Sequence, residues 1–293
     1  MLTALKLKIA LACAAGLAGP LAVAPMFSDH DLRSAAIHEP ALVELSPGTT
    51  SYRLAGDFTH AGKPAEAPLL RLSLARPLAI MTHQVSAADY QACVADGACH
   101  PFDRNVVVAV DRPAVQVSWH DANAYAVWLS RKTGDRYRLP TDEEWAFAAG
   151  SKFRDDGLPV DDSDPSKRWI SRYERESNSD QDTETRAFGA FGVNENGLSD
   201  LDGNVWEWTA TCFTRNVLDD AGQTITQSPN CGVRIAEGAH RAYVTDFIRD
   251  ARAGGCAAGV PPTNLGFRLV REQSSWTSKV ASRFGRTLSL SRS

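Results

Sequence analysis

The chain has 293 residues, of which 43% are hydrophobic and 23% are charged, a composition typical of a soluble globular protein with one large domain or two small ones. The formal net charge is -4, and acidic and basic residues are interspersed. Because binding to nucleic acid or to an anionic membrane surface usually needs a concentrated basic patch, this balance argues against both partners.

Residues 1–25 have the three parts of a secretory signal peptide. Lysines come before the apolar run Ile9–Leu17, and the small residues Ala22-Val23-Ala24 follow it. The run is too short for a comfortable bilayer span. Pro25 directly follows the small residues and is unfavourable for cleavage there, so an uncleaved membrane anchor is one alternative. Cys13 makes a lipoprotein signal a second alternative. We therefore expect an exported protein, located in the periplasm.

The cysteines beyond this segment suit an oxidising compartment, where two disulfides and one leftover thiol are expected. Cys93 and Cys99 bracket a short loop that a bridge could close, and Cys212 and Cys231 bracket a polar loop. Cys256 is then left over. Since connectivity cannot be deduced from sequence alone, both pairings are hypotheses.

The N-terminal part, residues 26–76, is predicted to be an extended segment that belongs to the domain. Prolines and glycines divide short apolar pieces such as Ala41–Leu45, a pattern that indicates one or two edge strands. Leucines then alternate with polar residues over Leu69–Ala75, which predicts a further strand.

Three helices are predicted next. The range Ser86–Gly97 begins with a capping residue, and the range His120–Gly134 opens near His120-Asp121. Both ranges place apolar residues at helical spacing before a glycine stop. The third helix begins at Thr141, where Glu144 stands three residues on as the capping-box partner, and it ends at Gly150.

The rest of the chain is rich in loops. The polar stretch Ser151–Asp182 is a candidate wall of a binding site, and Phe213–Gly232 is expected to be irregular. Between them, Val193–Thr209 alternates turn-forming residues with apolar anchors, which suits a rigid site floor or a hard-cation site. Phe267–Val270 is predicted to be a closing strand and residues 273–293 a flexible tail. This pattern predicts an α+β fold with few helices and short antiparallel sheets.

Four blocks, in order, resemble the formylglycine-generating enzyme family, also called sulfatase-modifying factor domains. They are VSWHDANAYAVWLSRKTGDRYRLPTDEEWAFAAG, NENGLSDLDGNVWEW, the basic run Arg241–Arg252, and NLGFRLV. With the helix QVSAADYQACV in front, the resemblance covers residues 77–272, which we take as the domain. It implies a fold similar to that of C-type lectins.

The family's enzymes use two cysteines, five positions apart before NLGFR, to hold copper(I) and oxidise a substrate cysteine with oxygen. Thiolates suit that soft ion. Counting back from the NLGFR block, the two positions fall on His240 and Thr245. The resemblance therefore implies a member without the copper-binding cysteine pair, so copper is not an expected cofactor. Cys256 remains as a lone thiol, either spare or reactive.

The resemblance also implies a structural calcium ion in the GNVWEW loop. The matching donors are the side chains of Asp200 and Glu207 with the carbonyls of Gly203 and Val205, and oxygen donors suit a hard cation. In the alternative interpretation, the two carboxylates cap turns and pair with arginines. The family's second calcium site is not expected, because Gly189 stands where a carboxylate is wanted.

Other chemistries have little support in the sequence. No two histidines form a ligand pair, and there is no nucleophile elbow or phosphate-binding glycine loop. The tryptophans expected in the core are Trp128, Trp145 and Trp206. The candidate pocket residues, whose arginines and aromatic ring would suit an anionic or peptide ligand, are His240, Thr245, Arg249, Arg252 and Trp208.

These patterns together predict an exported member of the family that serves as an accessory, maturation or ligand-binding module. Its expected partner is a periplasmic protein or peptide, for example a metalloenzyme such as copper nitrite reductase. The alternative is a divergent metal-dependent oxidase that uses His240. A purely structural, lectin-like interaction domain is a third hypothesis.

Overall fold

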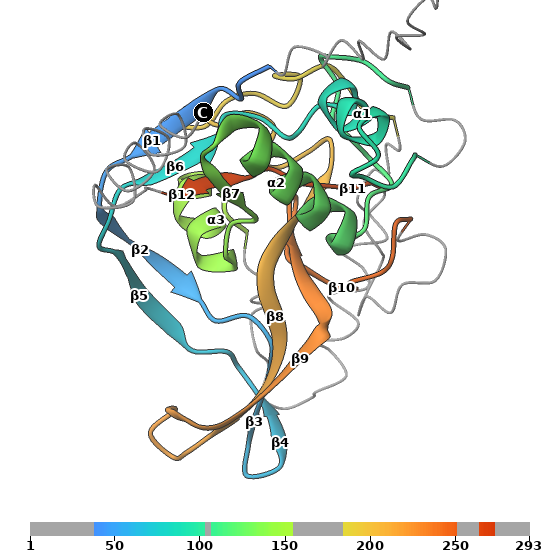
Figure 1. Ribbon diagram of the computed structural model, residues 1–293. Helices are drawn as coiled ribbons and strands as arrows, with labels where there is room; N and C mark the ends of the chain where they lie inside the picture. Colours follow the sequence, from blue (N-terminus) through green and yellow to red (C-terminus); the bar gives the residue numbers. More distant parts are fainter. Residues whose placement is uncertain (1–37, 103–106, 155–183, 251–263, 273–293) are drawn as a thin grey trace, which may run out of the picture. The chain divides into compact units, whose positions relative to one another are not determined.

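The computed structural model describes residues 38–102, 107–154, 184–250 and 264–272, and the structural statements below concern these residues. They contain the three α-helices α1 (Ala87–Ala95), α2 (Trp119–Thr133) and α3 (Asp142–Ala149), and the 3-10 turn η1 (Gly150–Lys152) (Figure 1). Within these ranges no helix combines the length and the apolar character that a bilayer span requires. The predicted N-terminal signal segment and C-terminal tail lie outside the described residues.

The helices begin and end where their capping residues predict. The Thr141 hydroxyl accepts the Glu144 N–H while the Glu144 carboxylate accepts the Thr141 N–H, which closes the capping box at the start of α3. Helix α2 has the same box at Ser118 and ends at Gly134, whose φ of 81° is the left-handed conformation that glycine adopts freely. The helix predictions are confirmed.

A four-stranded sheet joins both ends of the described chain. Its order is β1-β6-β12-β7, with antiparallel pairs throughout. The strands are β1 (Leu42–Leu45), β6 (Leu78–Met81), β12 (Val270–Glu272) and β7 (Arg136–Arg138). The edge strand expected near Ala41–Leu45 is therefore present as β1.

The largest sheet is built on a long hairpin, β8 (Trp206–Leu218) with β9 (Thr224–Glu237). Its order is β10-β9-β8-β3-β4, and β11 pairs with β8. In Figure 1 the hairpin runs away from the helices toward the β3–β4 turn. The additional strands are β10 (Ala242–Thr245), β3 (Asp57–His60), β4 (Lys63–Ala65) and β11 (Leu265–Gly266).

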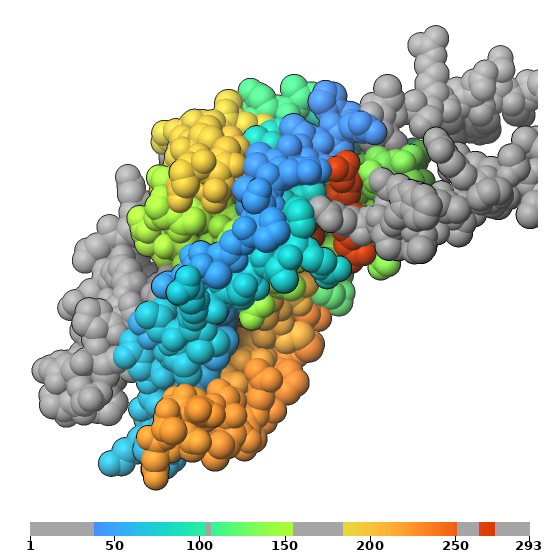
Figure 2. All heavy atoms as spheres, turned by 90° about the vertical axis from the view of Figure 1, so that its left-hand side faces the viewer, coloured from blue at the N-terminus to red at the C-terminus, as the bar shows by residue number. Residues whose placement is uncertain are grey.

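A two-stranded ribbon, β2 (Gly48–Arg53) with β5 (Leu69–Leu74), completes the sheets. Figure 2 shows its outer face in blue and cyan beside the orange tip of the β8–β9 hairpin. The strand predicted at Leu69–Ala75 is confirmed. Before this strand, the described part of the N-terminal segment contains four strands, β1 to β4, rather than the one or two expected. Strand β2 pairs with β5, and β3 pairs with β4 and with distant β8.

Two loop and strand predictions are wrong. Phe213–Gly232 is not irregular, since most of it lies in β8 and β9. Phe267–Val270 is not one strand, because Phe267–Leu269 falls between β11 and β12. There the carbonyls of Phe267 and Leu269 accept the N–H groups of Val85 and Met81. The predicted site wall at Ser151–Asp182 lies almost entirely outside the described residues.

The core has two adjoining clusters. The larger surrounds α2 and includes Tyr125, Leu129, Trp208 and Phe267. The smaller lies under α3 around Trp145. The two clusters hold β8, α2 and α3 together. They therefore position the residues that flank the segment Val193–Thr209.

Candidate functional site

Glu207 and Arg268 form an ion pair that is buried in the core. Arg268 Nε lies 2.5 Å from Glu207 Oε2, and a terminal nitrogen lies 2.7 Å from Oε1. Gln84 and Trp145 donate to the same carboxylate at 2.7 and 2.8 Å. The remaining Arg268 donors bond to the carbonyls of Met81, Thr82 and Ser199. All partners of this arginine and this carboxylate are therefore protein groups.

Asp200 organises the loop before β8. Its two carboxylate oxygens accept the N–H groups of Gly189, at 2.7 Å, and Phe191, at 2.8 Å. Its own backbone has a φ of 59°, a left-handed conformation that aspartate tolerates better than most residues. Asp200 thus ties the end of the loop to the turn at residues 189–192.

These contacts do not fit a calcium ion shared by the predicted ligands. The Glu207 oxygens face four N–H donors and the Asp200 oxygens face two, and the Gly203 carbonyl accepts the Val205 N–H at 2.9 Å. A calcium site needs oxygens that converge with free lone pairs. Arg268 supplies the positive charge that Glu207 requires, as the alternative interpretation expected of an arginine.

His240 is half-buried beside Trp206. Its Nδ1 lies 3.0 Å from the carbonyl oxygen of Arg241, and its ring meets that of Trp206 edge-on at 5.3 Å. Because a carbonyl can only accept, Nδ1 carries a proton in this contact. Thr245, at the end of β10, pairs with Val233 of β9. Neither position offers a thiol.

The other predicted pocket residues divide between surface and core. Arg249 is partly exposed and bonds to Asp121 Oδ2 at 3.0 Å. Trp208 is fully buried and donates to the Val117 carbonyl, so its assignment to an open pocket is wrong. Trp206, expected in the core, is instead partly exposed. Arg252 lies outside the described residues.

Aromatic and cationic groups line one face beside these residues. The Arg234 guanidinium lies over the Trp119 ring at 3.8 Å, close enough for a strong cation–π contact. Next to it, His120 Nε2 is 3.3 Å from Asp246 Oδ2. Phe247 follows, with 67% of its surface exposed. We call the residues Trp119, His120, Arg234, Asp246 and Phe247 the aromatic–cationic face.

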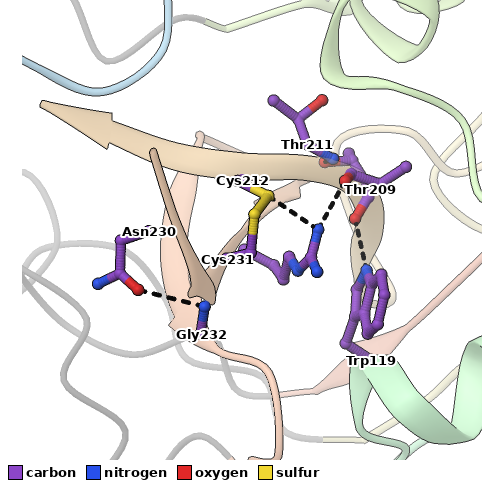
Figure 3. The surroundings of a disulfide bond; sticks show 9 residues. Trp119, Thr209, Thr211, Cys212, Asn230, Cys231 and Gly232 are labelled. Atoms are coloured by element: carbon purple, nitrogen blue, oxygen red, sulfur yellow. Dashed lines mark hydrogen bonds between the residues drawn. A yellow bond between two sulfur atoms is a disulfide. The ribbon is translucent and has the colours of Figure 1, made fainter. Parts of the chain in front are cut away.

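Both predicted disulfides are present. Cys93–Cys99 closes a six-residue separation and both cysteines are buried. Cys212–Cys231 joins β8 to β9. Figure 3 shows this second disulfide with Trp119 below it and the Asn230–Gly232 turn beside it. Cys256, expected to be the leftover thiol, lies outside the described residues.

A second buried ionic cluster is absent from the sequence predictions. Arg241 bonds to Glu237 Oε1 at 2.8 Å and to Asp142 Oδ2 at 3.0 Å, and Tyr52 donates to the same Asp142 oxygen. All four side chains are buried. Burial, reinforced by the Asp142 charge, raises the pKa of Glu237 well above its usual range. Only Glu237 and Arg241 are close in sequence, four residues apart. Tyr52 and Asp142 come from distant parts of the chain, so sequence spacing does not reveal the whole cluster.

Two surface cavities lie away from these groups. One, of about 430 Å³, is lined by residues that include Arg76, Arg138 and Arg271. The other, of about 390 Å³, lies along the β8–β9 hairpin beside Asn216. Neither of these two cavities is lined by a predicted pocket residue.

Residues 29–273 match the sulfatase-modifying factor enzyme 1-like domain. The chain belongs to this family. It is 31% identical over 211 residues to the formylglycine-generating enzyme of Mycobacterium tuberculosis, covering 61% of this chain and 65% of that one. It is 34% identical over 167 residues to the inactive C-alpha-formylglycine-generating enzyme 2 of Mus musculus, covering 54% and 49%.

Among solved structures, PvdO from Pseudomonas aeruginosa is similar, with a TM-score of 0.51 and 22% identity over 80% of this chain and 95% of that one. The predicted loop-rich α+β fold of the formylglycine-generating enzyme family is confirmed. The chain spans 65% and 49% of the two curated relatives above, so it corresponds to only part of each.

Proposed function

We propose that this family member is an exported accessory or ligand-binding module rather than a copper-dependent formylglycine-generating enzyme. The observation that supports the proposal is that the described part of the chain offers no free thiol for copper(I). Each cysteine in the described residues is bonded in a disulfide, and the positions counted from NLGFR hold His240 and Thr245. An imidazole and a hydroxyl cannot replace two thiolates around copper(I).

The similarity to a relative named as inactive supports this direction. The family fold is present in this chain, and the contacts of its buried Glu207–Arg268 pair do not involve the two positions where the thiols are missing. The scaffold can therefore persist and serve binding after the catalytic cysteines are lost.

The partner we propose is a periplasmic protein or peptide, for example an immature metalloenzyme such as copper nitrite reductase. Phe247 is largely exposed and Arg249 follows two residues later. Exposed aromatic residues and arginines contribute a large share of the energy in protein interfaces. The aromatic–cationic face is therefore the surface that the partner would contact.

Titration calorimetry with metal-free copper nitrite reductase tests this role. We expect binding that Phe247→Ala weakens at least about tenfold. Ile225→Ala is the matched control, because Ile225 is 65% exposed but lies at the hairpin, outside the aromatic–cationic face. Absence of binding, or equal weakening by both variants, would contradict this partner and this surface.

A second candidate function is a divergent metal-dependent oxidase. One observation favours it: His240 Nδ1 is bonded to the Arg241 carbonyl, so Nε2 is the ring nitrogen that would bind a metal ion. Elemental analysis and oxygen uptake distinguish the two functions. Stoichiometric copper or iron that disappears in His240→Ala, together with oxygen uptake, would establish the oxidase.

A further inference from the structure

We propose that Cys212–Cys231 is a thiol–disulfide exchange site, in which Cys231 is the sulfur attacked and Cys212 is the leaving thiolate. The proposal concerns reactivity that the family's copper chemistry does not involve. It rests on the exposure of Cys231 and on the charge placed beside the sulfur of Cys212.

Cys231 is exposed and lies at an irregularity in the hairpin. Phe213 pairs with Asn230 and Cys212 pairs with Arg234, so one step along β8 corresponds to four along β9. The extra residues bulge out of the ladder. Cys231 and Gly232 within this bulge are exposed, whereas Cys212 is half-buried. An incoming thiolate therefore has better access to Cys231.

The charge that favours cleavage comes from Arg234. A terminal nitrogen of its guanidinium lies 3.1 Å from Cys212 Sγ and 2.9 Å from the Ala210 carbonyl. The Trp119 ring covers its face, and Trp119 is itself fixed by donating to the Thr209 carbonyl (Figure 3). The guanidinium is thus held against the sulfur.

The Arg234 guanidinium forms no ion pair with a carboxylate among the described residues, and its Nε is buried without an acceptor. The carboxylate whose charge acts on Arg234 is that of Asp246, and this carboxylate pairs with His120. A thiolate at Cys212 would supply the missing negative charge. A neighbouring arginine lowers the pKa of a thiol and makes it a better leaving group.

The exchange balances without a metal or oxygen. The thiolate of a small thiol or of a protein cysteine attacks Cys231 Sγ and forms a mixed disulfide. The electron pair of the broken S–S bond remains on Cys212 as a thiolate. A second thiol then releases Cys231, and the two electrons have passed from the thiol partner to this chain.

Cys93–Cys99 provides an internal control. Both of its cysteines are buried in the core, and no arginine hydrogen bond to either sulfur is found in the described residues. The oxidised full chain should be equilibrated in glutathione buffers, trapped by alkylation and mapped by mass spectrometry. We expect Cys212–Cys231 to open at a thiol-to-disulfide ratio at least about tenfold lower than Cys93–Cys99.

Variants at Arg234 test the role of the charge. Arg234→Gln should slow opening by about tenfold and raise the pKa of reduced Cys212 toward that of a free thiol, measured by the pH profile of alkylation. Arg234→Lys should restore much of both effects. Arg215→Gln is the matched control, since Arg215 is an exposed arginine three residues along β8 from Cys212.

Reduced glutathione and reduced thioredoxin serve as separate probes. Arg234-dependent opening by both supports general exchange, and opening by one alone supports the site and identifies a small-molecule or a protein thiol as the partner. The proposal is overturned if neither opens this disulfide ahead of Cys93–Cys99, or if Arg234→Gln behaves like Arg215→Gln.

Discussion

Arg268 holds Glu207 with two hydrogen bonds, of 2.5 and 2.7 Å, and both side chains are fully buried. Glu207 lies in β8 between Trp206 and Trp208, while Arg268 lies between β11 and β12. One ion pair therefore joins the GNVWEW block to the NLGFR block, so two motifs that are distant in sequence are in direct contact in the core.

Removal of the Glu207 charge from this pair should lower the unfolding free energy of the whole domain. Glu207→Gln leaves Arg268 buried without a counter-ion, and the expected loss in unfolding free energy is about 3–5 kcal/mol. Urea unfolding measures it. The control is Arg271→Gln, because the Arg271–Glu44 pair is partly exposed, and its removal should cost less than about 1 kcal/mol. Equal losses would show that the buried pair has no special role.

Calcium removal should leave stability unchanged. The oxygens of Glu207 and Asp200 already accept protein N–H groups, so chelation should not move the melting temperature. A cation bound at a hundred times its dissociation constant would contribute about 2.7 kcal/mol. A clear drop in melting temperature with chelator, reversed by calcium, would instead support the calcium site predicted from the sequence.

The Tyr52–Asp142–Glu237–Arg241 cluster predicts a pH dependence. Burial raises the pKa of Glu237, with Asp142 adding to the rise, so the folded state binds this proton more tightly than the unfolded chain does. The contribution of Glu237 to unfolding free energy is then fully present below the ordinary glutamate pKa and is lost as pH rises through the raised value.

Glu237→Gln should remove this loss, because the amide resembles the neutral carboxyl at every pH. Unfolding free energy measured from acid to neutral pH should fall less steeply in the variant than in the unmodified protein. Parallel curves for the two proteins would show that Glu237 does not hold an additional proton in the folded state.

The start of α3 depends on one carboxylate. Glu144 accepts the Thr141 N–H and makes two hydrogen bonds to Arg138, at 2.6 and 2.7 Å. Glu144→Ala should cost about 1–2 kcal/mol in thermal or urea unfolding. The adjacent Glu143 takes no part in the capping box, so Glu143→Ala should change stability by less than about 0.5 kcal/mol.

Local capping explains why the helices could be predicted. Ser118, Thr141 and Gly134 act within a few residues of their own positions, so the sequence contains the necessary information. The β8–β9 hairpin was missed because residues 219–232 are mostly exposed. A strand without a buried face has no apolar alternation for the sequence to display.

The site was harder to predict because its contacts are distant in sequence. The alternation in Trp206-Glu207-Trp208 does not show which tryptophan is covered, since that depends on α2 and on the Val117 carbonyl. Likewise, Arg234 and Trp119 meet across the fold, and the bulge in β9 that separates exposed Cys231 from Arg234 is not visible in the local sequence. Such positions depend on tertiary packing rather than on local pattern.

This chain keeps the family fold, and we propose that it lacks the family's cysteine oxidation chemistry. The most direct measurement incubates the purified protein with copper(I), oxygen and a cysteine-containing peptide, with the Mycobacterium tuberculosis formylglycine-generating enzyme as the positive control. Mass spectrometry should find no aldehyde in the peptide treated with this protein. Formation of formylglycine, at a rate that depends on the added copper, would contradict the account.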